Sequence, residues 1–267
     1  MAKIAFIGTG NMGGAIAAAV SRCPDGNTLL LCNRHPEKAA ALAEKIGGSV
    51  CDNRSAAAAA DWIFLGVKPQ MLPSVLAELR QTLAARRDRF VLVSMAAGTA
   101  IQRVWELAGG EYPVIRIMPN TPASVGEGMV FYTLGPGVTE EEKQSFLRLM
   151  DGAGKLSELE ERLLDVGSAV AGCGPAFACM FVEAIADAGV ACGLSRSQAQ
   201  FFAAQMLLGT GKLLQESGRH PGELKDAVCS PGGATIQGVR VLEEKGFRGA
   251  VIDAVITAYR KHLDLSP

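Results

Sequence analysis

Two glycine-rich segments of this sequence have residue types that bind anions through the backbone. The first, Gly8-Thr9-Gly10-Asn11-Met12-Gly13, has the spacing G-x-G-x-x-G. One glycine permits a tight turn, the second lets the chain approach a pyrophosphate, and the third lets a helix pack on the preceding strand. The helix then offers free N–H groups to the phosphates. A tight structural turn can show the same spacing, but the position between an apolar run and an Ala-rich segment favours dinucleotide binding.

The residues after the second apolar run indicate which dinucleotide is bound. An NAD enzyme usually has a carboxylate here, on the adenosine ribose, whereas this chain has Asn33 and Arg34, followed by His35 and Lys38. An arginine can pair with a 2′-phosphate through two charge-assisted hydrogen bonds. We therefore expect NADPH. The alternative is that Arg34 and Lys38 form a solvated helix start; Asn33 can hydrogen-bond either cofactor, so NADH is the second choice.

Two further apolar runs end in turns that suit the rest of the cofactor. Ligands lie over the strand ends of an open α/β sheet, so small residues there make room for the nicotinamide and its ribose. Lys68 is locked before a proline, and we expect it to offer backbone groups rather than act as a catalytic lysine. The expected cofactor-binding residues are Gly8, Thr9, Gly10, Asn11, Met12, Asn33, Arg34, Asn53, Val67, Lys68, Pro69, Met95, Ala96 and Ala97.

The second glycine-rich segment is Ser230-Pro231-Gly232-Gly233-Ala234-Thr235, at the start of an expected helix over 235–244. Its N–H groups form a nest that can hold a carboxylate. The three histidines, at positions 35, 220 and 262, lack metal-ligand spacing, and no Ser/His/Asp arrangement is evident. A nucleotide site and a carboxylate site together indicate hydride transfer to a small acid. The stiff loop 116–122, with its two prolines, is where this substrate should meet the cofactor, although Asn120 and Thr121 are equally suited to forming the turn.

The elements that must position these residues are βα units followed by helices. Continuous apolar runs predict buried parallel strands at 3–7, 28–32, 49–51, 62–67, 90–94 and 114–118, with helices at 11–21 and 36–46. A capping box at Thr139 and Glu142 predicts another helix. Beyond residue 158 helical spacing dominates, at 163–170, 175–192, 196–216 and 247–263. We expect an α/β fold with a doubly wound parallel sheet in residues 1–158 and an all-α domain in residues 159–267.

Composition narrows the classes of partner. The 267 residues carry 26 basic and 27 acidic side chains, so there is no electrostatic footprint for nucleic acid or an anionic membrane. The apolar run 167–182 is too short to span a bilayer, and the N-terminus lacks the pattern of a secretory signal. Seven cysteines without a Cys-x-x-Cys pair are typical of buried thiols in a reducing compartment. We expect a cytoplasmic protein whose partners are small molecules or other subunits.

The helix expected over 175–192 is apolar on most of its circumference, with Glu183 and Asp187 its only charges. A domain of about one hundred residues has difficulty covering such a helix on all sides. The pattern therefore predicts a partner subunit. Burial within its own domain is the alternative, because Ala and Gly pack closely.

These motifs together resemble the pyrroline-5-carboxylate reductases over essentially the whole chain. The resemblance rests on the glycine loop, Asn33-Arg34, the segments 67–69, 96–98 and 116–122, His220-Pro221-Gly222-Glu223-Leu224-Lys225-Asp226 and above all Ser230–Thr235. It implies a Rossmann domain followed by a helical dimerisation domain, in homodimers that commonly build into decamers. It implies NADPH-dependent reduction of 1-pyrroline-5-carboxylate to L-proline, the last step of proline biosynthesis.

The resemblance also implies roles for single residues. The substrate carboxylate is held by Ser230, Gly232, Gly233, Ala234 and Thr235, and the Thr235 hydroxyl lies near the ring nitrogen as the catalytic contact, with no metal. The family usually has two serines and a tyrosine where this chain has Ala171, Cys173 and Phe177. The turn-forming glycines and proline are kept, so we expect the fold to survive without those hydroxyls. Cys173 is more typical of a small packed side chain than of a nucleophile.

Three alternatives stay open at this point. A β-hydroxyacid dehydrogenase has a similar plan but needs a lysine on the central helix, and residues 169–191 contain none. A reductase of the same fold that acts on a larger or six-membered cyclic imine acid is compatible with every motif. A catalytically silent NADP-binding regulator is compatible with the altered turn at 171–177.

Overall fold

The computed structural model of the chain describes residues 1–265, in two compact units. The first contains residues 1–173 and the end of the chain from Ala258, and the second contains Gly174–Thr257. The division by contacts falls at 173/174, fifteen residues after the boundary that we expect from composition. The difference arises because residues 159–173 leave the last strand and pack against the sheet before the helical unit begins. The 158/159 boundary stays a prediction.

The first unit is an eight-stranded sheet in the order β3-β2-β1-β4-β5-β6-β7-β8. Six strands are parallel, β7 runs antiparallel to β6, and β8 is parallel to β7. The order reverses at β1, as in a doubly wound fold, so the α/β prediction is confirmed, and the antiparallel pair extends it at one edge. The strands are β1 (Lys3–Ile7), β2 (Thr28–Cys32), β3 (Ser49–Val50), β4 (Trp62–Leu65), β5 (Val91–Ser94), β6 (Val114–Met118), β7 (Gly128–Leu134) and β8 (Gly154–Glu158).

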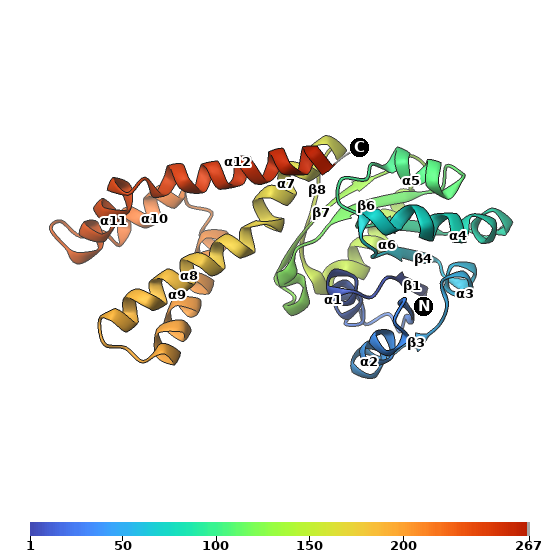
Figure 1. Cartoon of the computed structure of the whole chain (residues 1–267), viewed down its shortest axis with the longest axis horizontal. Coiled ribbons are helices and arrows are strands. Elements are labelled where there is room, and N and C mark those ends of the chain that lie inside the picture. Colours follow the sequence, from blue (N-terminus) through green and yellow to red (C-terminus); the bar gives the residue numbers. More distant parts are fainter. Residues whose placement is uncertain (266–267) are drawn as a thin grey trace. The chain divides into compact units, whose positions relative to one another are not determined.

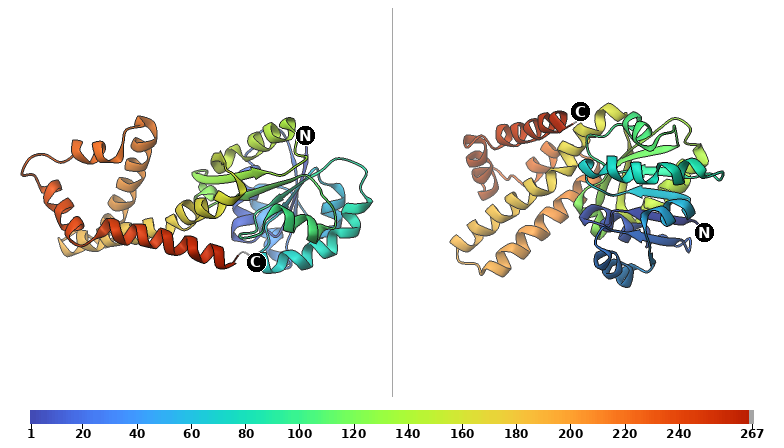
Figure 2. Two further views of the ribbon diagram at one scale, coloured as in Figure 1. Left: turned by 90° about the horizontal axis from the view of Figure 1, so that it is seen from above. Right: turned by 45° about the vertical axis from the view of Figure 1, so that its right-hand side comes forward.

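Helices cover both faces of this sheet (Figures 1 and 2). On one face α1 (Asn11–Val20), α2 (Pro36–Ile46) and α6 (Glu140–Met150) pack in a core that contains the stacked rings of Phe6 and Phe64. On the other, α3 (Asn53–Ala59), α4 (Leu72–Ala85) and α5 (Ile101–Ala108) cover a second core. The predicted capping box is present, since Thr139 and Glu142 exchange both hydrogen bonds at the start of α6. Two covered faces explain the continuous apolar strands.

The second unit is helical. Its helices are α8 (Gly174–Ala191), α9 (Arg196–Ser217), α10 (Pro221–Ala227), α11 (Ala234–Glu244) and the first part of α12 (Phe247–Leu265). Few side chains are buried there, Ala186, Ala199 and Ala203 among them, whereas Met180 is 69% exposed. The unit therefore leaves its apolar surfaces largely uncovered by itself, as expected of a domain completed by a second subunit.

The segment before the second unit differs from the single helix expected over 163–170. It consists of a 3₁₀ turn, the short helix α7 (Leu164–Gly167) and a π-helical stretch at Ser168–Gly172, where the Cys173 N–H donates to the Ser168 carbonyl at 2.9 Å. Together with α8 this makes a continuous helical stretch, Glu161–Ala191, that contains an 18-residue window with a mean hydropathy of 1.7. By length and composition alone this stretch is long and apolar enough to cross a membrane, because the helix extends beyond the run 167–182 on both sides. One such helix is weak evidence for a membrane.

Candidate active site

The glycine loop between β1 and α1 is shaped by contacts that exclude side chains. A Cβ atom on Gly13 would lie 2.0 Å from the Gly8 carbonyl oxygen, and one on Gly66 would lie 2.5 Å from the same atom. Gly8 itself has a positive φ of 98°. Gly10 differs, because a Cβ there would meet nothing within 4 Å. Three glycines close the turn, and the fourth faces open space at the start of α1, where a pyrophosphate would approach.

Backbone and side-chain hydrogen bonds join this loop to the end of β2. The N–H groups of Gly8 and Thr9 donate to the Cys32 carbonyl at 3.0 and 3.2 Å. The Asn33 amide donates to the Thr9 hydroxyl at 3.1 Å, and its oxygen accepts from the His35 N–H at 3.0 Å. Arg34 is exposed, and we find no ion pair to its guanidinium among residues 1–265. Asn33 therefore fixes the loop, while Arg34 is available for an anion.

A cavity of about 720 Å³ lies beside these groups. It is lined by seven of the residues expected to bind the cofactor, namely Gly8, Gly10, Asn33, Arg34, Asn53, Val67 and Lys68. Thr9 and Ala96 are buried, and Asn11, Met12, Pro69, Met95 and Ala97 lie outside the lining. The open face at Gly10 and the unpaired guanidinium of Arg34 fit the phosphate groups of a dinucleotide such as NADPH, bound in an extended conformation. The cofactor roles of all fourteen residues stay a proposal.

Sequence reasoning missed part of this cavity. Cys51, Asp52, Val75 and Glu78 also line it, and no motif announces them. The Asp52 carboxylate accepts from the Ser55 N–H at 2.9 Å, which caps α3 and lowers the pKa of Asp52. Burial raises the pKa of Cys51, whose sulfur lies 3.8 Å from that of Cys32, so both thiols stay protonated at neutral pH.

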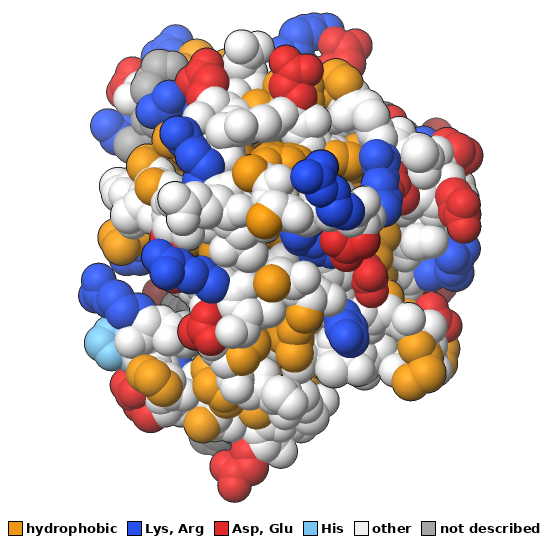
Figure 3. Space-filling view, turned by 90° about the vertical axis from the view of Figure 1, so that its right-hand side faces the viewer, with side chains coloured by type: hydrophobic (Ala, Val, Ile, Leu, Met, Phe, Trp, Pro, Cys, Tyr) orange, Lys and Arg blue, Asp and Glu red, His pale blue; other side chains and the backbone are white. Residues whose placement is uncertain are grey.

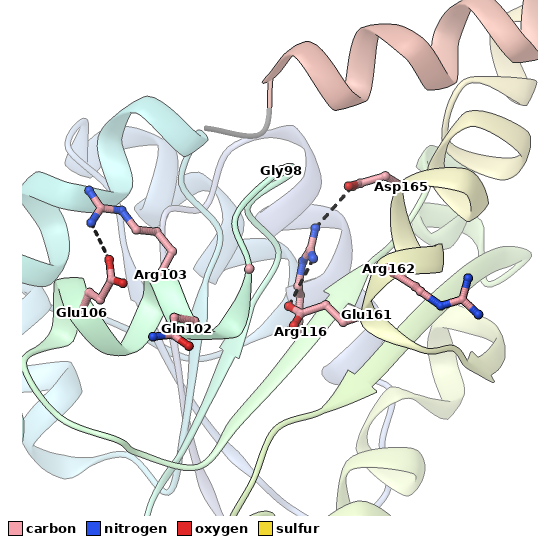
Figure 4. A pocket seen from close by; sticks show the side chains of 9 residues that line it. Gly98, Gln102, Arg103, Glu106, Arg116, Glu161, Arg162 and Asp165 are labelled. Carbon is pink, nitrogen blue, oxygen red and sulfur yellow. Dashed lines mark hydrogen bonds and ion pairs between the residues drawn. The ribbon is translucent and has the colours of Figure 1, made fainter.

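The loop after β6 is held by two side chains whose roles the sequence left open. The Asn120 amide donates to the Ala171 carbonyl at 2.9 Å, and its oxygen accepts from the Met129 N–H at 2.9 Å. Asn120 thus fixes the loop. Arg116 is only 3% exposed, and its guanidinium pairs with Glu161 at 3.2 Å and Asp165 at 3.3 Å (Figure 4).

The Arg116 cluster also anchors the start of α5. The Glu161 carboxylate that pairs with the arginine accepts a further hydrogen bond from the Ile101 N–H at 2.8 Å. The cluster lines a cavity of about 810 Å³, which the Arg103–Glu106 pair also lines (Figure 4). Because acids already occupy its guanidinium, Arg116 connects β6 to the segment beyond β8 rather than offering a site for a substrate carboxylate.

The second glycine-rich segment opens α11 as expected. The Gly233 N–H donates to the Ser230 carbonyl at 3.0 Å, and Gly232 has a positive φ of 70°. A Cβ on Gly233 would meet the Ser230 hydroxyl oxygen and would lie 3.1 Å from the Ser230 carbonyl oxygen, so any larger residue there requires the serine side chain to rotate. We find no side-chain cap on α11, and Ala234 and Thr235 are exposed in its first turn. The first N–H groups of this helix are therefore open to an anion, beside the Thr235 hydroxyl.

Comparison with known proteins shows the family of this chain. A family model described as pyrroline-5-carboxylate reductase dimerisation matches residues 161–265, and one described as NADP oxidoreductase coenzyme F420-dependent matches residues 3–98. The pyrroline-5-carboxylate reductase of Escherichia coli is 42% identical over 99% of this chain and 98% of its own length. The chain belongs to the pyrroline-5-carboxylate reductase family. It is an oxidoreductase that uses NAD(P)H and reduces pyrroline-5-carboxylate in proline biosynthesis.

Solved structures of pyrroline-5-carboxylate reductases show the same fold. The enzyme from Coxiella burnetii has a TM-score of 0.90 at 30% identity and covers 100% of this chain and 99% of its own. The enzyme from Plasmodium falciparum, solved with NADP bound, has a TM-score of 0.88 at 29% identity, covering 100% and 98%. The reductase family thus accounts for both units of the chain, from the glycine loop to the last helix.

Proposed function

We propose that this reductase binds NADPH in the cavity beside the glycine loop and the carboxylate of 1-pyrroline-5-carboxylate at residues 230–235. The observation that supports both assignments is the pair of open backbone cradles, at Gly10 and at the first turn of α11. Each presents N–H groups without a side-chain cap, one suited to a pyrophosphate and the other to a carboxylate. Two anion sites on one oxidoreductase match a dinucleotide and a cyclic imino acid.

Each part of the cofactor has residues suited to hold it. The N–H groups at Gly10 and Asn11 hold the pyrophosphate, Arg34 pairs with the 2′-phosphate, and the small loop 95–97 leaves space for the nicotinamide ring. NADPH supplies the hydride when bound. A carboxylate at the Arg34 position would repel the 2′-phosphate, so the arginine favours NADPH over NADH.

At the substrate, residues 230–235 orient the ring and stabilise its charge. Backbone N–H groups from Gly232 to Thr235 hold the carboxylate, and the Thr235 hydroxyl hydrogen-bonds the ring nitrogen. Protonation of that nitrogen makes the adjacent ring carbon electrophilic, so positioning and one hydrogen bond suffice without a strong general acid in the protein. The product is L-proline.

The assembly follows from the uncovered apolar surface of the helical unit. A cavity of about 550 Å³ is lined almost entirely by apolar side chains of α8, α11 and α12, including Phe177, Phe181 and Phe247. An apolar surface of this kind is typical of a subunit interface, and the dimerisation match supports a homo-oligomer. Homodimers that build into a cytoplasmic decamer complete the proposal.

Acidic and basic side chains alternate on the face of the first unit in Figure 3, in keeping with small-molecule partners.

The test is NADPH oxidation followed at 340 nm with 1-pyrroline-5-carboxylate and, in parallel, with the six-membered imine acid. We expect turnover with the five-membered ring and at least a tenfold lower kcat/KM with the larger one. Thr235→Ala should lower kcat by ten- to a hundredfold, the scale of one hydrogen bond to a charged group. Thr210→Ala is the control, because within the described residues that hydroxyl bonds only the carbonyl and the sulfur of Met206 in its own helix. No turnover with either imine would refute the proposal.

A further inference from the structure

One end of the cofactor cavity has an unexpected composition. Val67, Met71 and Val75 form an apolar wall, and beside them lies the carboxylate of Glu78, half-buried on α4. The Asn53 amide donates to one oxygen of Glu78 at 3.1 Å. A side chain from the start of α3 thus holds this carboxylate in a fixed position at the cavity wall.

A carboxylate is out of place in a cavity for a ligand that carries several phosphate charges, unless it accepts a hydrogen bond from that ligand. The other carboxylate of the lining, Asp52, is accounted for by its cap on α3. Glu78 caps no helix, and within residues 1–265 we find no ion pair to it. Its second oxygen is therefore available as an acceptor.

The ligand group that Glu78 faces follows from elimination. In the proposed cofactor site the pyrophosphate lies at Gly8 and Gly10 and the adenosine ribose lies at Asn33 and Arg34, four residues that line the cavity. A dinucleotide has three kinds of hydrogen-bond donor, which are the ribose hydroxyls, the nicotinamide carboxamide and the 6-amino group of adenine. Adenine and nicotinamide both combine a flat face, suited to the valine and methionine wall, with a donor at the edge. We assign the nicotinamide to the loop 95–97, none of whose residues lines this cavity, so adenine is the group that remains.

We propose that Glu78, held by Asn53, is a specificity-determining residue that accepts a hydrogen bond from the 6-amino group of the adenine. This inference rests on the proposed cofactor site. It assigns to Glu78 the choice of 6-aminopurine dinucleotides over those with a 6-oxo group. A 6-oxo group would place a second acceptor oxygen against the Glu78 carboxylate. Because neither oxygen carries a proton, no hydrogen bond could form between them.

An exchange of the acceptor for a donor tests this assignment. Dissociation constants of the intact homo-oligomer are measured by fluorescence titration with NADPH and with its 6-deamino analogue, which carries hypoxanthine. The wild type should bind NADPH at least tenfold more tightly. Glu78→Gln, whose amide can donate to a 6-oxo group, should reduce the preference below threefold, chiefly by binding the hypoxanthine analogue more tightly than the wild type does.

Two further variants separate hydrogen bonding from other effects. Glu37→Gln removes a charge near the ribose end without a hydrogen bond to the base, and it should leave the tenfold ratio unchanged. Asn53→Ala releases the Glu78 carboxylate and should lower the ratio to an intermediate value. Thermal unfolding checks that each variant is folded.

The outcomes distinguish this inference from the proposed function. Equal affinity of the wild type for both nucleotides would overturn the role of Glu78 and leave the cofactor site standing. A Glu78→Gln variant that binds both nucleotides more weakly than the wild type, by the same factor, would also overturn it. Failure of the wild type to bind either nucleotide would overturn the cofactor site and this inference together.

Discussion

Replacement of Glu161 by alanine should destabilise the fold far more than its position in a turn suggests. At 3.2 Å and an effective dielectric constant of about 20, its attraction to Arg116 is about 5 kcal/mol, most of it offset by desolvation. Loss of one partner of a buried pair costs about 3–5 kcal/mol. Because the Glu161 side chain is 34% exposed and Asp165 still pairs with Arg116, we expect the loss to be about 2–3 kcal/mol.

The assay is thermal unfolding at a fixed protomer concentration, because an oligomer's stability depends on concentration. A loss of about 2–3 kcal/mol lowers Tm by roughly 5–10 °C for a chain of this size. The neighbouring Glu160→Ala is the control, since its pair with Arg162 is exposed on both sides and should contribute less than about 0.5 kcal/mol. Equal losses for the two variants would refute the argument that the buried arginine makes Glu161 important.

Three further predictions concern the cofactor loop and the sheet edge. Gly10→Ala should keep the wild-type Tm but weaken NADPH binding more than tenfold, because the new Cβ would occupy the open space where the pyrophosphate would lie. Gly13→Ala should lower both the Tm and the affinity for NADPH, because its Cβ would meet the Gly8 carbonyl oxygen; the reverse pattern in thermal melts and a binding titration would contradict this. Arg34→Asp should raise KM for NADPH by about 10–100-fold and change KM for NADH little in steady-state kinetics, whereas equal losses would remove the arginine from the 2′-phosphate site. Burial raises the pKa of Glu142, but the hydrogen bonds from Arg89 and from the helix cap outweigh it and lower that pKa, so this carboxylate stabilises the fold above its unfolded pKa and stops doing so as pH falls through the folded value. Glu142→Gln should therefore cost about 1 kcal/mol at pH 7 in urea unfolding, and this cost should disappear as the pH falls through the folded pKa of Glu142; a cost independent of pH would refute the assignment.

Local patterns predict the first half of the fold closely. Apolar runs bounded by Gly, Pro and Asn predict the observed ends of β1, β2 and β6, and they place β3 and β5 within one residue of theirs. The expected strand at 62–67 is too long because Gly66 and Val67 turn away to meet the glycine loop. Such patterns carry no information on strand direction at the sheet edge, so they could not show that β7 runs antiparallel to β6.

Long-range polar contacts explain most of what the sequence could not show. Glu161 bonds a helix start 60 residues away and an arginine 45 residues away, and Asn53 bonds Glu78 across 25 residues. No spacing rule relates such positions, because only the fold brings them together. The π-helical stretch before Cys173 could not be predicted for a different reason. Its backbone hydrogen bonds join residues five apart rather than four apart, and an apolar sequence pattern does not distinguish the two.

Transfer of deuterium to the product from NADPH that is deuterated at both C4 positions tests the central claim most directly. With 1-pyrroline-5-carboxylate as substrate, we predict L-proline that carries one deuterium at Cδ, formed in a one-to-one ratio with NADP⁺ and measured by mass spectrometry. Thr235→Ala should form the same labelled product at a much lower rate. Proline without deuterium, or NADPH oxidation without proline, would contradict hydride transfer to the ring carbon in this reductase.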